Sequence, residues 1–239
     1  YSGKIIIAIP ENETIPTVTA NIPDGEVYIK QGTVTTLVTS SADNTTIIGA
    51  KAKIETLIVQ KGNVRIEDGG KVTTIQRQDN QDNVTYVIYE AATAPTITLG
   101  EGVLLVSAAE FDLLTAVANG GEVTLTSDVV LTTTMEISNG KTVTIDLNGH
   151  IISQSKECAA SYSMITNKGT LTIKDTSSEG DGKITFQDLS NGGGSVWGSY
   201  VITNNGTLVV ENGTLEHLGS ANPEAHNTNL PIQNYRYIF

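Results

Sequence analysis

Two stretches of this chain carry nearly the same phrase. Residues 165–175 read Ile-Thr-Asn-Lys-Gly-Thr-Leu-Thr-Ile-Lys-Asp, and residues 202–212 read Ile-Thr-Asn-Asn-Gly-Thr-Leu-Val-Val-Glu-Asn. Each copy is a short β-prone run interrupted by a polar turn. Repetition at such a spacing is typical of folds built from stacked repeats. We interpret the offset of 37 residues as slightly less than two coils of a solenoid.

A second repeat lies nearer the N-terminus. Residues 33–38, 53–58 and 71–76 align as Thr-Val-Thr-Thr-Leu-Val, Lys-Ile-Glu-Thr-Leu-Ile and Lys-Val-Thr-Thr-Ile-Gln, at spacings of 20 and 18 residues. Glycine-rich or polar turns separate these runs, which are too short for a hairpin meander. Parallel stacking explains why the phrase recurs in one sense, so we favour a solenoid over a β-sandwich.

The composition agrees with an all-β chain. Charged residues make up 17% of the 239 residues, whereas 33 Thr, 18 Asn and 23 Gly are present. Threonine is β-branched and suits a half-buried strand, and Asn and Gly suit turns. A net charge of −12 without clustered Lys or Arg argues against a nucleic-acid partner. No stretch has the length and apolar character of a membrane span.

One segment departs from the β pattern. Ser107 and Glu110 have the spacing of a helix capping box, apolar residues follow at helical spacing, and residues 119–121 read Asn-Gly-Gly. We therefore expect a helix near 107–119 that caps the second solenoid segment. An ordinary crossover helix is the alternative. Because proline avoids central strands, Pro95 marks the expected join between segments 1–95 and 96–239.

Four phrases carry a resemblance to a known family: residues 121–128, 139–150, 167–175 and 205–215. In these phrases residues 107–219 resemble the right-handed parallel β-helix proteins of the pectate-lyase-like superfamily. They are most similar to β-helix segments of large bacterial cell-surface proteins. The resemblance implies a right-handed β-helix with a helical N-terminal cap, and it says little about activity.

Enzymes on this fold use carboxylates, with Ca²⁺ and a basic residue in lyases or a carboxylate pair in hydrolases. The best candidates are Asp146, expected to point away from the apolar side, and His150, expected in a turn. Both also fit the recurring coil phrase. The loop 175–182 could bind Ca²⁺ or be a solvated turn, but it lacks an EF-hand pattern. We assign no catalytic residue, metal or cofactor, and expect the single cysteine, Cys158, to be structural.

The loop 187–200 is the most suggestive binding feature, because it holds the only tryptophan. An aromatic ring beside amide, carboxylate and hydroxyl groups suits a sugar. The alternative is that Trp197 packs back onto the coil. The candidate ligand residues are Trp197, Tyr200, Asp188 and Asn191.

Two functional hypotheses follow. The first is a non-catalytic solenoid of a secreted or cell-surface bacterial protein that is structural or adhesive and binds glycans or other surface proteins. The second is a polysaccharide lyase or glycoside hydrolase on the same scaffold, which rests on fold analogy alone. We expect an extracellular or cell-surface location, with any export signal or anchor outside this sequence.

Overall fold

The computed structural model describes residues 3–22, 25–41, 45–78, 84–155, 163–188, 200–220 and 232–234. The chain divides into two compact units, residues 1–108 and 109–239. Each unit has its own hydrophobic core of buried Val, Ile and Leu side chains. The two units are therefore described separately.

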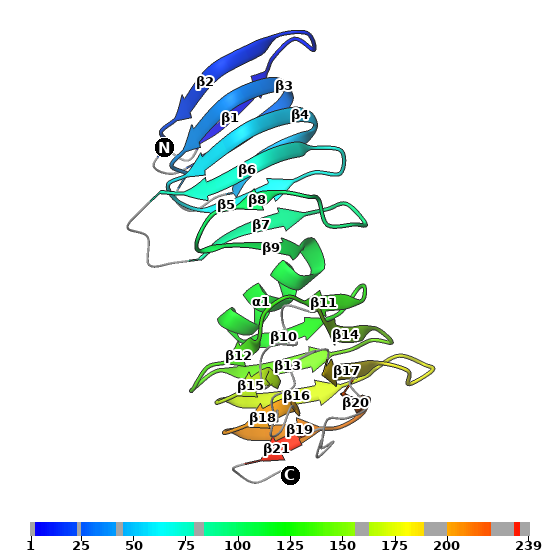
Figure 1. Cartoon of the computed structure of the whole chain (residues 1–239). Helices are drawn as coiled ribbons and strands as arrows, with labels where there is room; N and C mark the ends of the chain where they lie inside the picture. The colour runs from blue at the N-terminus through cyan, green and yellow to red at the C-terminus, as the bar shows by residue number, and fades with distance from the viewer. Residues whose placement is uncertain are drawn as a thin grey trace. The chain divides into compact units, whose positions relative to one another are not determined.

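The first unit is a nine-stranded sheet whose strands pair in parallel (Figure 1). Its strands are β1 (Gly3–Ala8), β2 (Thr14–Ala20), β3 (Gly25–Thr39), β4 (Thr45–Val59), β5 (Asn63–Ile66), β6 (Lys71–Arg77), β7 (Thr85–Tyr89), β8 (Thr98–Leu99) and β9 (Val103–Ser107). The long strands β3 and β4 pair with each other along both halves. The first half of β3 also pairs with β1 and the second half with β2, whereas β4 adds β5 and β6 in the same way.

The register of the first unit confirms the N-terminal repeat. Val34 lies beside Ile54, and Ile54 beside Val72, so the aligned phrases are stacked neighbours. All three side chains are buried, which explains why the apolar positions recur at the coil spacing. The same register stacks threonines in one row across five strands: Thr17, Thr36, Thr56, Thr74 and Thr98.

The first unit extends beyond Pro95. Strand β8 pairs with β6, and β9 pairs with β7, although both follow the proline in sequence. Pro95 lies in the connection between β7 and β8, where no ladder hydrogen bond is needed from it. The division between the compact units falls at Ala108 and Ala109, next to the start of the helix, rather than at the proline.

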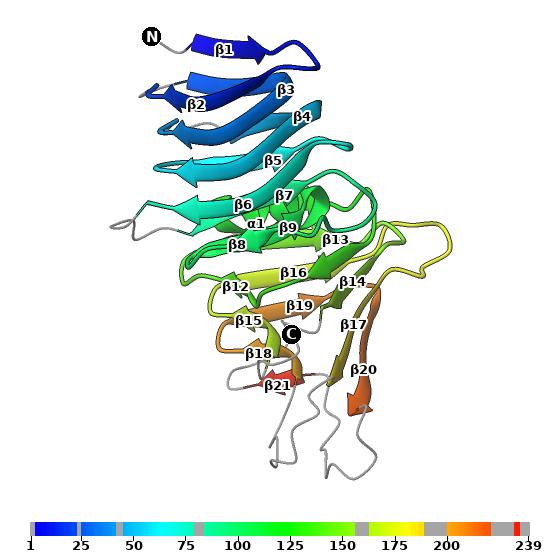
Figure 2. The same ribbon diagram turned by 45° about the horizontal axis from the view of Figure 1, so that its top comes forward.

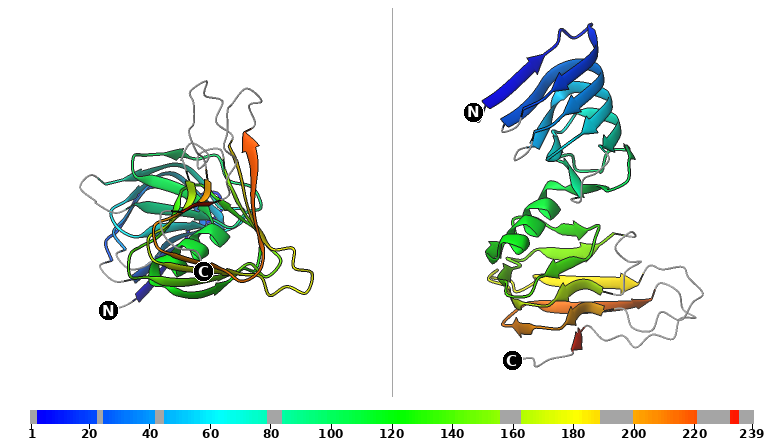
Figure 3. Two further views of the ribbon diagram at one scale, coloured as in Figure 1. Left: turned by 90° about the horizontal axis from the view of Figure 1, so that it is seen from below. Right: turned by 90° about the vertical axis from the view of Figure 1, so that its left-hand side faces the viewer.

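The second unit contains three four-stranded parallel sheets (Figure 2). Sheet 1 consists of β10 (Gly121–Thr124), β13 (Thr142–Asp146), β16 (Thr170–Lys174) and β19 (Thr207–Val210). Sheet 2 consists of β11 (Val129–Leu131), β14 (Ile151–Gln154), β17 (Lys183–Asp188) and β20 (Thr214–Ser220). Sheet 3 consists of β12 (Met135–Ile137), β15 (Ser163–Asn167), β18 (Tyr200–Asn204) and β21 (Ile232–Asn234). Each coil of the chain gives one strand to each sheet in turn, an arrangement consistent with a β-solenoid (Figure 3).

The two copies of the opening phrase occupy adjacent coils. Ile165 pairs with Ile202 in sheet 3, and Leu171 pairs with Leu208 in sheet 1. Our interpretation of the 37-residue offset as nearly two coils is therefore wrong. The offset is one coil, and this coil is long because many residues separate β17, which ends at Asp188, from β18, which begins at Tyr200.

The helix α1 (Ala108–Asn119) begins the second unit. Leu113 and Val117 are buried in its core, and the Glu110 carboxylate accepts hydrogen bonds from Thr132 in the turn between β11 and β12. The helix ends at Gly120, whose φ of 82° only glycine adopts without strain. Because β10, β11 and β12 are the first strands of their sheets, α1 packs on the first coil, as expected of a cap.

Candidate functional site

The corner between sheets 3 and 1 is the site where the described structure forms a polar hollow. The chain turns this corner at residues 138–141 in the first coil, 168–169 in the second and 205–206 in the third. The three turns stack because the strands on both sides of them pair in register.

Buried asparagines hold the stacked turns together. Asn167 and Asn204 are fully buried at equivalent positions, and the Asn167 Nδ2 donates to the Asn204 Oδ1 at 2.7 Å and to the Thr207 carbonyl at 2.8 Å. The side-chain oxygens of Asn167 and Asn204 accept the backbone N–H groups of Gly169 and Gly206. The ladder satisfies polar groups that the turns would otherwise bury unpaired.

The register also shows which residues occupy the equivalent position on either side of the two asparagines. The position is Ile137 in β12 and Asn234 in β21, and the Asn234 side chain lies outside the described residues. This ladder was not among the features predicted from the sequence. Its signal was present, because both copies of the repeat place Asn directly after Ile-Thr, at Asn167 and Asn204.

Glycine allows the turns to approach closely. A Cβ on Gly169 would lie 2.4 Å from the Lys141 carbonyl oxygen, and a Cβ on Gly206 would lie 2.0 Å from the Gly169 carbonyl oxygen. Both contacts are with backbone atoms, which cannot move aside as a side chain can. The glycines therefore set the coil spacing at this corner.

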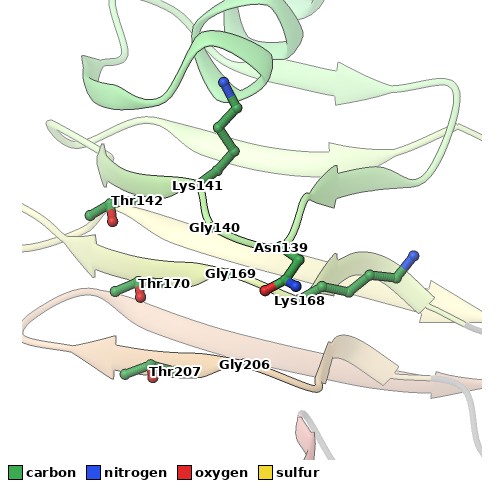
Figure 4. A pocket seen from close by; sticks show the side chains of 9 residues that line it. All are labelled: Asn139, Gly140, Lys141, Thr142, Lys168, Gly169, Thr170, Gly206 and Thr207. Atoms are coloured by element: carbon green, nitrogen blue, oxygen red, sulfur yellow. The ribbon is translucent and has the colours of Figure 1, made fainter.

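The hollow has a volume of about 260 Å³ (Figure 4). Its lining combines backbone, amide, hydroxyl and ammonium-bearing residues from three coils: Asn139, Gly140, Lys141, Thr142, Lys168, Gly169, Thr170, Gly206 and Thr207. Thr142, Thr170 and Thr207 stand in register, and in Figure 4 their side chains lie on one side of the hollow. This row presents hydroxyl groups at the inter-strand spacing of about 4.8 Å.

The outer face of sheet 1 continues this polar surface. In the next row on this outer face, Thr144 pairs with Thr172, and Thr172 pairs with Val209 of β19. Beyond them the Lys174 Nζ contacts the Glu122 Oε1 at 2.6 Å. Hydrogen bonding to Glu122 raises the pKa of Lys174. The face is therefore lined mainly by threonine, and at its far side Lys174 contacts both Glu122 and, at 3.9 Å, the Asp146 Oδ2.

The two lysines of the hollow point away from the threonine row (Figure 4). The Lys141 Nζ donates to the Asn119 carbonyl at 3.3 Å, where a cation favours the C-terminus of α1. The Lys168 Nζ lies 2.8 Å from the Glu136 Oε2. The ammonium groups thus have partners of their own, and mainly the lysine stems and the backbone shape the hollow.

The corner between sheets 1 and 2 uses aspartates for a structural purpose. The Asp175 Oδ1 accepts the N–H groups of Gly149 and Ser177, and its Oδ2 accepts the N–H of Gly182. Burial alone would raise the pKa of Asp175, but the hydrogen bonds from Gly149, Gly182 and Ser177 stabilise the charged form and lower it. Asp175 therefore closes a turn and belongs to the frame of the coil.

Asp146 lies outside the apolar core, beside Lys174, whose Nζ is 3.9 Å from the Asp146 Oδ2, but it is not exposed to solvent. It is 4% exposed, and its carboxylate accepts the N–H groups of Asn148 and Thr176 and the Thr176 hydroxyl. Its burial comes from the next coil, because Thr176 covers the carboxylate with its N–H and hydroxyl groups. His150 follows that turn, and its Nδ1 lies 3.4 Å from the Asp128 Oδ1.

The loop 175–182 is a hydrogen-bonded turn. The Ser177 hydroxyl donates to Asp181 and accepts the N–H of Gly180, and residues 178–181 are exposed. Among the described residues, no three His, Cys, Asp or Glu side chains gather in a way that could hold a metal ion.

One of the predicted ligand residues, Tyr200, lies at the other end of β18 from the hollow. Tyr200 opens β18 and pairs with Ser163, whereas the hollow follows Asn204 at the end of that strand. Asp188 ends β17 and pairs with Ser220, but its side chain, like all of Trp197, Asn191 and Cys158, lies outside the described residues. The structure therefore places only Tyr200 of the set, away from the hollow, and sugar contact by the predicted set stays a prediction.

Within the described part of the chain, no helix combines the length and apolar character needed to cross a lipid bilayer. Comparison of the chain with protein-family models, with curated proteins and with solved structures gives no match.

Proposed function

We propose that this chain is a non-catalytic β-solenoid module of a secreted or cell-surface bacterial protein, and that it serves as an adhesive scaffold that binds glycans. The observation that carries the proposal is the hollow at the corner of sheets 3 and 1. Fixed hydroxyl, amide and backbone groups in a concave site are the groups that recognise sugar hydroxyls. Here they repeat from coil to coil, which suits a ligand that also repeats.

The proposal includes a finer account of the fold. We infer that the coils of the second unit wind in the right-handed sense of pectate-lyase-like β-helices. The support is the parallel pairing in all three sheets and the helix on the first coil. A strand, crossover and parallel strand in one sheet is nearly always right-handed, which favours this sense.

The roles of the carboxylates support a scaffold over an enzyme. Asp146 and Asp175 accept backbone N–H groups in turns, and Glu110 binds Thr132. Glu122, Glu136 and Glu216 each contact a lysine. These groups are engaged in holding coils together.

A second contact region belongs to the same proposal. The loop 187–200 follows β17 and carries Trp197, which can stack on a sugar ring. It enters β18 at the opposite end from the hollow, so the two regions could contact separate parts of a long glycan or a glycosylated surface protein. Trp197→Ala tests this region independently of the hollow.

The test is a glycan-array screen of the purified chain, followed by calorimetry on each ligand found. Thr170→Val keeps the side-chain shape but removes a hydroxyl from the hollow, so we expect affinity to fall about tenfold for one lost hydrogen bond. Thr214→Val, on an exposed position of β20, is the matched control and should bind as the parent does.

Three results would contradict the proposal in different ways. If no glycan binds, the glycan-binding role is wrong and only a scaffold remains. If Thr170→Val and Trp197→Ala both bind normally, neither region is the site. If the purified chain releases sugar fragments from polysaccharides, the chain is an enzyme and the non-catalytic assignment fails.

A further inference from the structure

Asparagine followed by glycine recurs six times in this chain, at Asn119, Asn139, Asn148, Asn191, Asn205 and Asn212. The two residues of such a pair can react with each other. The glycine backbone N lies close to the asparagine Cγ, and glycine has no side chain to hinder their approach. Whether it does so in a folded protein depends on how firmly the two groups are held. The described structure allows five of the six pairs to be compared.

Three pairs have a glycine N–H that is already engaged. Gly120 donates to the Ala116 carbonyl at 2.9 Å at the end of α1, and Gly206 donates to the Asn204 side chain at 3.3 Å. Gly149 donates to the Asp175 carboxylate at 2.9 Å. The Asp175 bond is the strongest restraint, since a hydrogen bond to a charged acceptor is worth roughly twice a neutral one.

The side-chain amide is also held at two pairs. The Asn148 Nδ2 donates to the Leu125 carbonyl at 3.1 Å, and the Asn212 Nδ2 donates to the Asp175 carbonyl at 3.4 Å. Asn148 is therefore restrained at both reacting groups. Asn212 is restrained only at its amide, by a long hydrogen bond.

Asn139 differs from the other four. Asn139 and Gly140 are exposed, and within the described residues neither the Asn139 amide nor the Gly140 N–H has a hydrogen-bond partner. Gly140 has a φ of 78°, and a Cβ placed on it would meet nothing within 4 Å. The pair thus has room to rearrange, and its reaction does not require any existing hydrogen bond to break.

We propose that Asn139 is the site at which the folded chain modifies itself by deamidation. The Gly140 backbone N loses its proton and attacks the Asn139 Cγ, forming an N–Cγ bond. The Cγ–Nδ2 bond breaks, and the amide nitrogen leaves as ammonia with the displaced proton. Water then opens the five-membered succinimide at either carbonyl, giving aspartate or isoaspartate.

The product would change the hollow. Asn139 lines it together with Lys141 and Lys168 (Figure 4), so the reaction places a new negative charge beside two lysine side chains. Isoaspartate also lengthens the backbone of the turn, which the Lys141 N–H closes onto the Ser138 carbonyl at 3.1 Å. The modification therefore acts on the shape as well as on the charge of the hollow. It does not depend on what the hollow binds.

The experiment is to incubate the folded, full chain at mildly alkaline pH in heavy-oxygen water and to follow each asparagine by peptide mass spectrometry. We expect Asn139 to lose its amide at least about tenfold faster than Asn148, the ratio that corresponds to loss of one or two hydrogen bonds at Asn148. Asn212 should react at an intermediate rate. In denaturant the described pairs should converge to similar rates.

Two controls make the outcome decisive. Asn139→Gln should abolish the first acidic species that appears on ion exchange, and an Asn139→Asp chain should co-elute with the aspartate form of that species. Equal rates at Asn139 and Asn148 in the folded chain would overturn the proposal. So would the same rate ranking in the unfolded chain, because the ranking would then come from local sequence and not from the fold.

Discussion

Glu110 and Asp175 are both buried carboxylates, yet their surroundings act on them in opposite directions. Glu110 is fully buried, and burial raises its pKa to about 7 although Thr132 donates hydrogen bonds that lower it. At Asp175 burial also acts upward, but the N–H groups of Gly149, Gly182 and Ser177 outweigh it and lower the pKa. The balance between burial and hydrogen bonding decides the sign, because burial outweighs the hydrogen bonds from Thr132 and Thr133 at Glu110, whereas the hydrogen bonds prevail at Asp175.

Glu110 should make the stability of the second unit depend on pH. Because its folded pKa is raised from 4.5 to about 7, its contribution is fully present below pH 4.5 and is lost as the pH rises through about 7. Urea denaturation of the parent at a series of pH values should show a decreasing free energy of unfolding across this window. Glu110→Gln, which keeps the shape without the charge, should flatten that part of the profile. An unchanged slope in Glu110→Gln would show that another group is responsible.

At the scale of elements, the turns between sheets 3 and 1 depend on the asparagine ladder more than on the sequence of the strands. The Asn167 side chain donates to Asn204 and Thr207 of the next coil and accepts the Gly169 N–H of its own turn. Thr166, one residue earlier, lies on the outer face of the same strand and is half-buried. Substitutions at Asn167 and Thr166 can therefore distinguish the contribution of the asparagine ladder from that of the strand β15.

Replacing Asn167 by alanine should therefore destabilise the second unit strongly. The change leaves the Gly169 N–H and the Asn204 side chain without their partner in a buried place, at a cost of about 2–4 kcal/mol. Thr166→Ala, as the matched control, should cost less than about 1 kcal/mol. The measurement is the urea midpoint at constant m-value. Equal losses in the two variants would mean that the ladder is not a main support of the corner.

Sequence reasoning identified the elements where one residue pattern repeats at every coil. The phrases at 33–38, 53–58 and 71–76 align because each must fill the same core, and the structure stacks them as predicted. The number of coils between the two copies of the repeat was predicted wrongly, because the connections between strands vary in length. The residues between Asp188 and Tyr200 lengthen one coil, so spacing alone could not distinguish one coil from two.

The candidate site was less predictable than the fold. The hollow forms from turns of three coils, and only the register shows that Asn139, Lys168 and Gly206 lie together. The burial of Asp146 was not predicted, because it comes from Thr176 in the turn of the next coil and not from the strand that carries Asp146. The formation of the hollow and the burial of Asp146 both depend on how neighbouring coils stack, which the sequence of one coil does not reveal.

At the scale of the whole molecule, both compact units use the same means of stability. In each, parallel strands stack in register around a core of buried Val, Ile and Leu, and rows of threonine follow the stack on the outside. The single cysteine excludes an internal disulfide, so ladder hydrogen bonds and packing carry the stability. The hollow and the asparagine ladder both depend on one claim, that residues 165–175 and 202–212 lie in adjacent coils.

That claim is tested most directly by a disulfide between Thr172→Cys and Val209→Cys in a Cys158→Ser background. The two positions pair across β16 and β19, and neighbouring strands about 4.8 Å apart satisfy the geometry of a disulfide. We predict that this bond forms on mild oxidation, whereas Thr172→Cys with Glu211→Cys, displaced by two residues, stays reduced. If the first pair also stays reduced, or if both pairs cross-link equally, the copies are not stacked in this register and the account is contradicted.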